Sequence, residues 1–179
     1  MKKNLPLYIA LGVVVVLVLW FISAQNSLVT LEENVTAKWS QVENVYQRRL
    51  DLIPNLVATV KGYADQEKEL LTEITELRSR VGQMNVSSDI LDDPAAFERF
   101  QQAQGQLGGA LSRLLVVSEN YPDLKSNQNF LALQSQLEGS ENRIAVERKR
   151  FIEAVQEYNT AIRRFPNSLV AGLGGFDKT

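Results

Sequence analysis

The sequence contains no cysteine and no histidine among its 179 residues. These two absences exclude disulfide bonds, thiol nucleophiles, zinc sites built from thiolate or imidazole, histidine ligation of haem, and every catalytic triad that uses an imidazole. They also exclude a lipoprotein, because its anchor requires an acylated cysteine. Most common enzyme chemistries are therefore closed to this chain, and we expect neither a cofactor nor a metal site.

Proline and glycine are scarce, with 5 and 10 residues, and 45% of the residues are hydrophobic. This composition is typical of one folded domain and not of a disordered or collagen-like chain. The charges nearly balance, with 19 Lys and Arg against 21 Asp and Glu, and no long basic run occurs. Electrostatic capture of phosphate therefore has little support, and we expect no nucleic-acid partner.

Leu5–Ile22 is an uncharged stretch whose only polar side-chain groups are the Tyr8 hydroxyl and the Trp20 indole. As a helix it reaches roughly 27 Å, which matches the hydrocarbon core of a bilayer. Tyr8 and Trp20 lie near its ends, where aromatic rings prefer the headgroup level. The sequence therefore predicts a short N-terminus over residues 1–4, a transmembrane helix over residues 5–24, and the lipid bilayer as a partner. The residues assigned to this anchor are Leu5, Tyr8, Gly12, Val16, Trp20 and Ile22.

A cleaved signal peptide is the competing interpretation of this stretch. Lys2 and Lys3 precede the apolar run, and Ala24 has the small side chain of a cleavage site. However, the run is long for a signal peptide, the position two before Ala24 is the bulky Ile22, and a helical pattern follows without a linker. An uncleaved anchor is therefore favoured.

The charges that flank the anchor set its expected orientation. Lys2 and Lys3 lie on one side, whereas Glu32 and Glu33 lie on the other, with no basic residue before Lys38. Because basic residues stay on the cytoplasmic side, we expect the N-terminus in the cytoplasm and the bulk of the chain outside it.

Apolar side chains recur from Leu28 to Val81 with a mean spacing of about 3.5 residues, the period of a left-handed helical bundle. This seam runs through Leu28, Leu31, Val35, Trp39, Val42, Tyr46, Leu50, Ile53, Val57, Val60, Ala64, Glu67, Leu71 and Ile74. The spacing predicts one very long amphipathic helix. Pro54 lies inside it, and because the seam keeps its phase across Pro54, we expect a kink there and not a chain reversal.

The segment Gly82–Asp93 breaks this pattern and is expected to form the one long surface loop. Asp93 and Pro94 then predict a helix start, with an acidic N-cap followed by proline at the first helical position. This second helix is expected to cover about 25 residues. It ends near Tyr121, because Pro122 pushes the preceding residue out of helical geometry.

A third helix is expected from about Asn127 to Phe165, where Pro166 stops it, and Asn167–Thr179 is expected to be an irregular tail. No strand pattern of useful length occurs outside the anchor. The predicted fold is all-α: a transmembrane helix, then an elongated antiparallel bundle of long helices over residues 25–166, then the tail over residues 167–179. The small Gly12 in the span and the glycines of the second helix favour a homo-oligomer.

Several short strings, in one fixed order, resemble the signature of the LemA family. They are Arg48–Val57, Thr59–Ala64, Glu119–Lys125, Leu133-Gln134 with Leu137-Glu138, Glu141–Ala145 and Glu157–Asn159. The structural or interaction residues that they supply are Arg48, Arg49, Asp51, Pro54, Asn55, Lys61, Tyr63, Glu119, Asn120, Tyr121, Pro122, Asp123, Glu141, Asn142, Arg143, Tyr158 and Asn159. The chain departs from the family at Phe151-Ile152, where a Tyr-Asn pair is usual, and in its short C-terminal segment.

This resemblance implies a bacterial protein that is anchored in the cytoplasmic membrane by one span and carries a bundle of long helices. It does not imply an enzyme, because no catalytic activity is established for the family. Genes of the family often lie near those of TPM-domain proteins or metallopeptidases, which implies an envelope partner of that kind. A magnetosome-associated branch exists, and no residue here selects it.

Three acidic residues near the end of the expected loop, Asp89, Asp92 and Asp93, offer the oxygen ligands that Ca²⁺ prefers. Their spacing does not fit the twelve-residue EF-hand loop, and Asp93 is already explained as a helix cap. We therefore favour a loop without a metal ion.

Three polar side chains, Glu67, Gln104 and Glu141, fall on the apolar seams, where paired carboxylates can serve as acid and base. Side chains at such positions more often fix helix register or pair with arginines, for which Arg143 and Arg48 are candidates. We favour this structural role and expect no catalytic residue.

The third helix is locally basic at Arg143, at Arg148–Arg150 and at Arg163-Arg164. A solvated face or a set of ion-pair partners is favoured over a lipid site. We therefore assign these charges no specific ligand.

Together these observations favour a single-pass scaffold or interaction protein of the cell envelope that self-associates and serves a partner. The alternative is a regulatory or accessory subunit of a membrane-associated hydrolase or peptidase system. A cleft with converging titratable groups would favour the alternative, whereas exposed apolar or charged faces would favour the scaffold.

Overall fold

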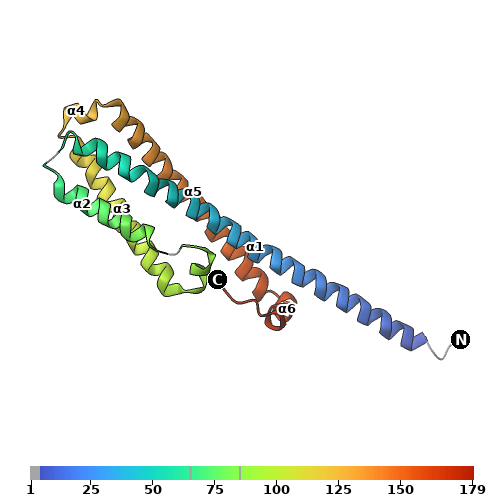
Figure 1. Ribbon diagram of the computed structural model, residues 1–179. Helices are drawn as coiled ribbons and strands as arrows, with labels where there is room; N and C mark the ends of the chain where they lie inside the picture. Colours follow the sequence, from blue (N-terminus) through green and yellow to red (C-terminus); the bar gives the residue numbers. More distant parts are fainter. Residues whose placement is uncertain (1–4, 65, 85) are drawn as a thin grey trace. The chain divides into compact units, whose positions relative to one another are not determined.

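The structure is a computed structural model that describes residues 5–64, 66–84 and 86–179, with side chains from residue 8 onward. Its elements, in chain order, are α1 (Leu5–Lys61), α2 (Lys68–Gly82), the 3₁₀ helix η2 (Ser88–Asp92), α3 (Pro94–Ser118), α4 (Pro122–Lys125), α5 (Gln128–Arg163) and α6 (Asn167–Gly174), drawn in Figure 1. The described residues contain no strand. The prediction of an all-α fold with an apolar N-terminal helix is confirmed.

The chain forms two compact units. Unit 1 contains residues 1–38 and 150–179, and unit 2 contains residues 39–149. Both α1 and α5 are long enough to contribute to each unit.

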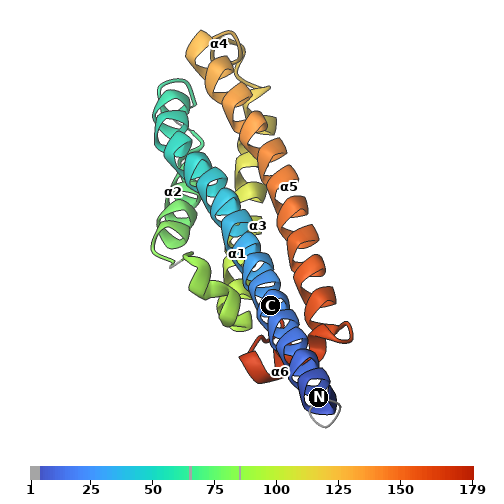
Figure 2. The ribbon, with the colours of Figure 1, turned by 90° about the vertical axis from the view of Figure 1, so that its right-hand side faces the viewer.

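Unit 2 consists of the second part of α1, helices α2, α3 and α4, and the first part of α5, which lie side by side in Figures 1 and 2. Each long helix contributes an apolar stripe at helical spacing, and the stripes meet in one core. Its fully buried side chains include Trp39, Val42, Ile53, Leu56, Ile74, Leu107, Leu114, Leu124 and Phe130.

The first helix of the bundle ends at Lys61, and the prediction of one continuous helix to Val81 is wrong. The Ala64 N–H still bonds to the Val60 carbonyl, but the chain then turns, and α2 runs back antiparallel to α1 (Figure 1). The weak helix former Gly62 lies at this break. The apolar period persisted through the turn because α2 returns to the same core, where it buries Leu71 and Ile74. Periodicity reports which face is buried and not the direction of the chain.

Pro54 lies inside α1, as expected, so the chain does not reverse there. Asp93 caps α3, as predicted: one carboxylate oxygen accepts hydrogen bonds from the N–H groups of Ala95 and Ala96, each at 3.0 Å. The length of α3, 25 residues, also matches the expectation.

The expected loop between α2 and α3 is partly ordered by η2, whose Ile90 is buried. Trp39 of α1 holds the preceding segment, because its indole N–H donates a 2.9 Å hydrogen bond to the Val86 carbonyl. A lone indole N–H on an apolar seam requires an acceptor when it is buried. The loop supplies that acceptor.

Unit 1 consists of the first part of α1, the last part of α5, and α6. Residues 167–174 form the helix α6, so the prediction of an irregular tail is wrong for this segment. Val170 and Ala171 are buried, which explains why the helix forms despite its glycines. Gly175, at a φ of 73°, ends it in the left-handed conformation that favours glycine.

Candidate functional site

The most concentrated set of polar contacts in unit 2 surrounds Arg49, whose side chain is buried on the core face of α1. Its Nη1 donates to the Glu141 carboxylate of α5 at 2.8 Å. Its Nη2 donates to the side-chain carbonyl of Gln104 in α3 and, at 3.4 Å, to the backbone carbonyl of the same residue. One guanidinium therefore joins three helices.

A glycine and an aromatic ring lie beside this guanidinium. A Cβ atom at Gly108 would lie 3.7 Å from Arg49 Nη1, which is an ordinary van der Waals contact, so Gly108 adjoins the cluster without a side chain being excluded there. On the other side the Arg49 guanidinium lies 5.3 Å from the centroid of the Tyr46 ring, within range of a cation–π interaction. Burial raises the pKa of the Tyr46 hydroxyl above 10.0, although the nearby Arg148 and Arg49 charges oppose that rise.

The sequence identified the polar seam residues but not their partner. Gln104 and Glu141 do meet an arginine, but it is Arg49, and both Arg48 and Arg143 are exposed. Arg49 is one position from Leu50, which was placed on the seam. The buried stripe of a helix is wide enough to include both position 49 and position 50. The place of Arg49 beside Leu50 would therefore have indicated the correct arginine.

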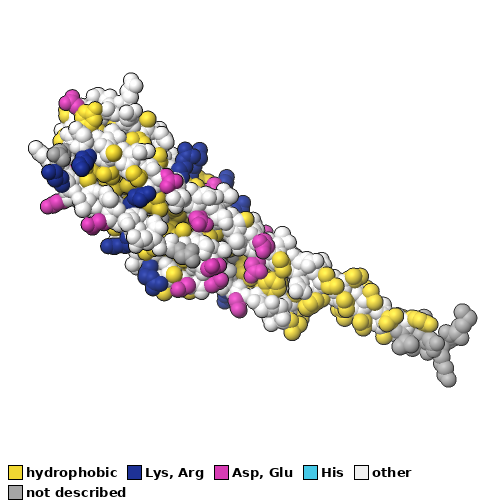
Figure 3. Space-filling view, in the orientation of Figure 1, with side chains coloured by type: hydrophobic (Ala, Val, Ile, Leu, Met, Phe, Trp, Pro, Cys, Tyr) yellow, Lys and Arg dark blue, Asp and Glu magenta, His cyan; other side chains and the backbone are white. Residues whose placement is uncertain are grey.

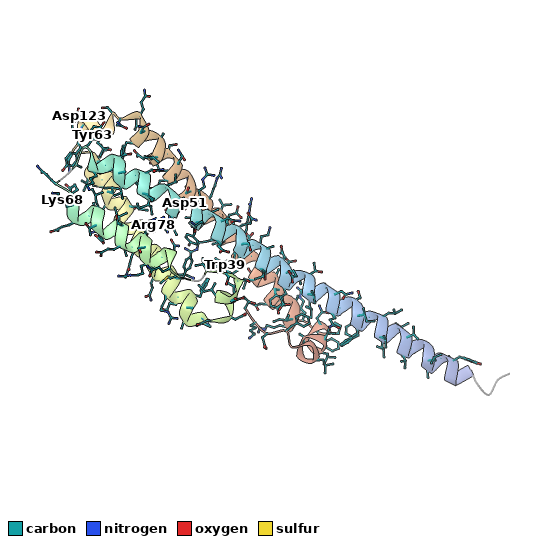
Figure 4. All side chains as sticks on the ribbon, viewed as in Figure 1. Trp39, Asp51, Tyr63, Lys68, Arg78 and Asp123 are labelled. Carbon is teal, nitrogen blue, oxygen red and sulfur yellow. The ribbon has the colours of Figure 1, made fainter. Side chains whose placement is uncertain are left out.

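A second polar contact explains the role of Pro54. Proline has no N–H, so the carbonyl of Leu50, one helical turn earlier, loses its usual partner within α1. The Arg78 Nε of α2 donates to that carbonyl at 3.2 Å. Pro54 thus creates an acceptor in α1, and α2 docks on it; Figure 4 labels Arg78 beside the Asp51 turn of α1. This partner was missed by sequence reasoning, although the proline itself indicated an unpaired carbonyl.

Family-motif residues also tie together the end of unit 2 where α1, α2, α3, α4 and α5 begin or end. The Tyr121 hydroxyl donates to the Glu67 carboxylate at 3.1 Å, and the Asn127 amide donates to the Tyr63 hydroxyl at 2.9 Å. Partial removal from water, followed by the hydrogen bond and charge of Glu67, raises the pKa of Tyr121. These contacts close the chain turns.

Two further contacts lie at the same end. Lys125 forms an ion pair with Glu119, and both side chains are exposed. Pro122 opens α4, Asp123 lies in its first turn, and Leu124 of the same turn is buried. The segment that was expected to be a turn is therefore the short helix α4, which is packed through Leu124.

In unit 1 the buried Tyr158 of α5 donates to the Glu32 carboxylate of α1 at 3.5 Å. Removal from water, with the charge and hydrogen bond of Glu32, raises the pKa of Tyr158 to about 12. The next residue, Asn159, bonds Thr179 in both directions: its amide donates to the Thr179 carbonyl at 3.0 Å, and its carbonyl accepts from the Thr179 N–H at 3.3 Å. These two motif residues hold α5 to α1 and to the C-terminal segment.

The remaining motif residues lie on the surface. Exposed positions are Arg48, Asp51, Pro54, Asn55, Lys61, Asn120, Asn142 and Arg143. Asp51 accepts a hydrogen bond from Gln47 one turn earlier at 2.9 Å, and the Asn55 carbonyl accepts from Thr59. The motif thus divides into a part that holds helices together and an exposed part that lies mainly on α1 and α5.

The acidic residues of the expected loop do not converge. Asp93 is engaged as the cap of α3, and one oxygen of Asp89 accepts a 3.3 Å hydrogen bond from the Ser87 hydroxyl. Among the described residues no group of three or more Asp and Glu side chains is placed to hold a metal ion.

The first part of α1 has the composition of a membrane span. Within the described residues it is the one helix long and apolar enough to cross a bilayer, with a mean hydropathy of 2.3 in its most apolar window. Tyr8, Gly12, Val16 and Ile22 are exposed, and Trp20 is half-buried; Leu5 lies within α1. Only 6% of that window is covered by the protein itself.

The contacts of the Arg49 cluster hold α1, α3 and α5 together. Glutamine is neither an acid nor a base, and Glu141 supplies the one carboxylate among Arg49, Gln104 and Glu141. Its oxygen is held by Arg49. Removing any member would leave a desolvated polar group without its partner, which is what makes such clusters specify one arrangement of helices.

Comparisons with known proteins identify the family of this chain. A model of the LemA family matches residues 38–179. The magnetosome protein MamQ of Magnetospirillum gryphiswaldense is 28% identical, over 97% of this chain and 71% of its own length. Magnetosome protein MamQ 2 of Paramagnetospirillum magneticum is 29% identical, over 86% of this chain and 62% of its own length.

A relative with a different name matches as well. Protein LemA of Metamycoplasma hominis is 23% identical, over 84% of this chain and 65% of its own length. None of these names is that of an enzyme. The family model covers well over half of the sequence, and the chain therefore belongs to the LemA family.

Proposed function

We propose that this chain is a single-pass, membrane-anchored interaction protein of the bacterial cell envelope, without a catalytic role of its own. In this proposal the first part of α1 spans the cytoplasmic membrane, with the N-terminus in the cytoplasm. The bundle lies outside the cytoplasm, associates with further copies of the chain, and serves an envelope partner. By family resemblance that partner is a TPM-domain or metallopeptidase-like protein.

The observation that carries the proposal is the uncovered apolar surface of α1. Every side chain from Tyr8 to Leu19 is exposed, although nearly all of them are hydrophobic. A helix that is apolar on all sides is unfavourable in water, whereas it is well solvated by the hydrocarbon core of a bilayer. Lipid is therefore the cover that this segment requires.

The polar residues support a role in interaction. The buried motif residues join helices, as at Arg49 and Tyr158, and the exposed ones lie mainly along α1 and α5. Relatives named for the magnetosome, at 28% and 29% identity, and one named LemA, at 23%, all match most of this chain. The proposal is accordingly a role common to the family and not a magnetosome role.

Anchoring is tested with the full chain and a variant that lacks residues 5–24. The full chain should stay with membranes washed in alkaline carbonate, whereas the variant should be released with its helical circular dichroism intact. Release of the full chain would contradict the proposal. So would a mature protein that begins after Ala24, which mass spectrometry detects, because it would mean that the apolar stretch is a cleaved signal.

Orientation is tested with single cysteines, which are clean probes because the native chain has none. A membrane-impermeant maleimide should label Lys178→Cys in cells whose outer barrier is permeabilised and whose cytoplasmic membrane is intact. The matched control, Lys3→Cys, should be labelled only after lysis. The reverse pattern would place the bundle in the cytoplasm.

Self-association is tested by cross-linking in native membranes, which should give species above the 20.1 kDa monomer. No atom lies within 4 Å of a Cβ built at Gly12, so this position is free to contact a second helix. Gly12→Leu should weaken the cross-linked species, whereas Val13→Leu should not. A monomer alone in membranes and in mild detergent would remove self-association and leave only a role with another protein.

A further inference from the structure

An exposed apolar stripe lies on α6 and on the turn that precedes it. Phe165, Leu169 and Leu173 are 81%, 58% and 79% exposed. Leu169 and Leu173 are four residues apart in α6, so they follow one another along one face of that helix, and Phe165 lies in the turn that leads into it. Large apolar side chains occur singly on most protein surfaces, but three in one stripe indicate a contact.

The opposite face of α6 is occupied by its own unit. Val170 and Ala171 are buried, which fixes the rotation of the helix and points the stripe away from the protein. The stripe is therefore exposed because α6 is docked through its other face, and not because the segment is unpacked. Arg163 and Arg164, immediately before it, are also exposed.

The place of α6 along α1 identifies what covers the stripe. Side chains of α1 are fully exposed from Tyr8 to Leu19, become half-buried at Trp20 and Phe21, and are buried at Ala24 and Leu28. Protein cover therefore begins where the apolar stretch ends. In Figures 1 and 2 α6 lies beside this part of α1 within unit 1.

From this place toward the N-terminus, the visible surface of α1 is apolar and without charge. Figure 3 shows hydrophobic side chains along α1 toward the N-terminus, with no Lys, Arg, Asp or Glu on that part of the visible face. Trp20 marks the level at which indole rings sit between hydrocarbon and water. A second apolar stripe at the same level faces the same boundary.

We propose that α6 is a second membrane contact, which inserts Phe165, Leu169 and Leu173 into the interfacial layer of the bilayer from which α1 emerges. The stripe supplies the apolar area, and Arg163 and Arg164 lie where a headgroup phosphate binds a guanidinium. The occupant is a lipid surface, because α6 lies beside the part of α1 where the exposed apolar stretch ends and protein cover begins. This inference rests on the proposed anchoring of α1, and its consequence is that the bundle is held at the membrane at two points.

The inference is tested by fluorescence of the full chain in vesicles of phosphatidylcholine and phosphatidylglycerol. An environment-sensitive dye is attached to one cysteine at a time: Leu173→Cys in the stripe, Val16→Cys in the span, and Val116→Cys as the control. Val116, in α3, is 71% exposed, so it matches Leu173 in exposure and in apolar character. Quenchers are a nitroxide carried on the lipid and iodide in the water.

The dye at position 173 should emit at shorter wavelength than the dye at 116. Lipid nitroxide should quench it, and iodide should quench it several-fold less than it quenches position 116. Leu169→Ser in the same labelled protein should lower the lipid quenching at 173, and unchanged thermal unfolding would show that α6 still docks through Val170 and Ala171.

Three results would overturn the inference. If position 173 behaves like 116 while position 16 is quenched by lipid, α6 is off the membrane and the anchor still stands. If 173 is shielded from iodide but not quenched by lipid, a protein covers the stripe. If position 16 is itself not quenched by lipid, the anchoring proposal fails, and the second contact fails with it.

Discussion

One helix, α1, runs through two different environments. From Tyr8 to Leu19 every side chain is exposed and nearly all are apolar, whereas from Trp39 to Val60 exposed positions alternate with a buried stripe. The two parts share backbone geometry and many of the same residue types. The difference shows that the arrangement of apolar residues, and not their number, indicates what covers a helix. Apolar residues all round the helix indicate lipid, whereas apolar residues on one stripe indicate packing against protein.

The polar content of the two parts differs for the same reason. In the bundle part, neighbouring helices provide hydrogen-bond partners for the buried Arg49 guanidinium and for the carbonyl that Pro54 leaves unpaired within α1. The apolar part carries no such group between residues 8 and 19. Lipid offers no hydrogen-bond partner, so in a span every backbone carbonyl depends on the helix itself.

A valine-to-arginine substitution should affect a different property in each part of α1: the stability of the bundle in one and membrane insertion in the other. Val42→Arg places a charge in the core of unit 2, and it should lower the free energy of unfolding in detergent by more than about 4 kcal/mol. Val16→Arg should leave that unfolding unchanged but oppose insertion, at a cost of about 2.5–3.5 kcal/mol. Thermal denaturation and membrane fractionation measure the two effects. If Val16→Arg also destabilised the bundle, the apolar part would have a protein partner.

Adjacent arginines in the bundle part should differ strongly. Arg49→Ala leaves Gln104 and Glu141 without their shared partner, and we expect a loss of about 2–3 kcal/mol of stability. Arg48→Ala, on the exposed side, should change stability by less than about 0.5 kcal/mol. Chemical denaturation in detergent compares the two variants. Equal effects would mean that the Arg49 cluster does not hold α1, α3 and α5 together.

Local signals in the sequence predicted the boundaries of α3 and α5. Asp93 with Pro94 indicated the start of α3, and the ends of α3 and α5 lie a few residues before Pro122 and Pro166. The apolar stretch of α1 was recognisable because a long run without charge is a local feature of the sequence. The break at Gly62 was not, because an apolar period continues unchanged when the chain turns and returns to the same core.

Partners across helices were the part that sequence alone did not give. Arg49 and Arg48 are neighbours of one residue type, and only the packing of α3 and α5 decides which of them is buried. The tail was expected to be irregular because its glycines are poor helix formers. Burial of Val170 and Ala171 outweighs that local cost, and burial depends on elements far away in sequence.

The hydrogen bond between Tyr158 and Glu32, which ties the first part of α1 to α5, should be visible in the pH dependence of stability. The folded protein holds the Tyr158 proton to a pKa of about 12, whereas an ordinary tyrosine loses it near 10.0. Between these values the folded state binds more protons than the unfolded chain, so stability should be unaffected below pH 10 and fall as pH rises toward 12.

Tyr158→Phe should reduce this fall, and Tyr46 and Tyr121, whose pKa values are also raised, account for what remains. Tyr63→Phe is the control, because it leaves all three groups in place. Denaturant unfolding at a series of pH values measures the effect. An unchanged alkaline fall in Tyr158→Phe would mean that the Tyr158 hydroxyl is not buried against Glu32 in solution.

The smallest expected effect tests why the bundle part of α1 can contain a proline. Arg78→Ala should lower stability by about 1 kcal/mol, because it removes the donor to the Leu50 carbonyl. In a Pro54→Ala background the backbone N–H that the substitution adds can reach that carbonyl within the helix, so Arg78→Ala should then cost less, and a double-mutant cycle measures the coupling. Arg80→Ala, exposed on the same helix, should show no coupling to Pro54. Equal costs of Arg78→Ala in both backgrounds would mean that α2 docks on α1 through its apolar stripe alone, and that Pro54 has a different role.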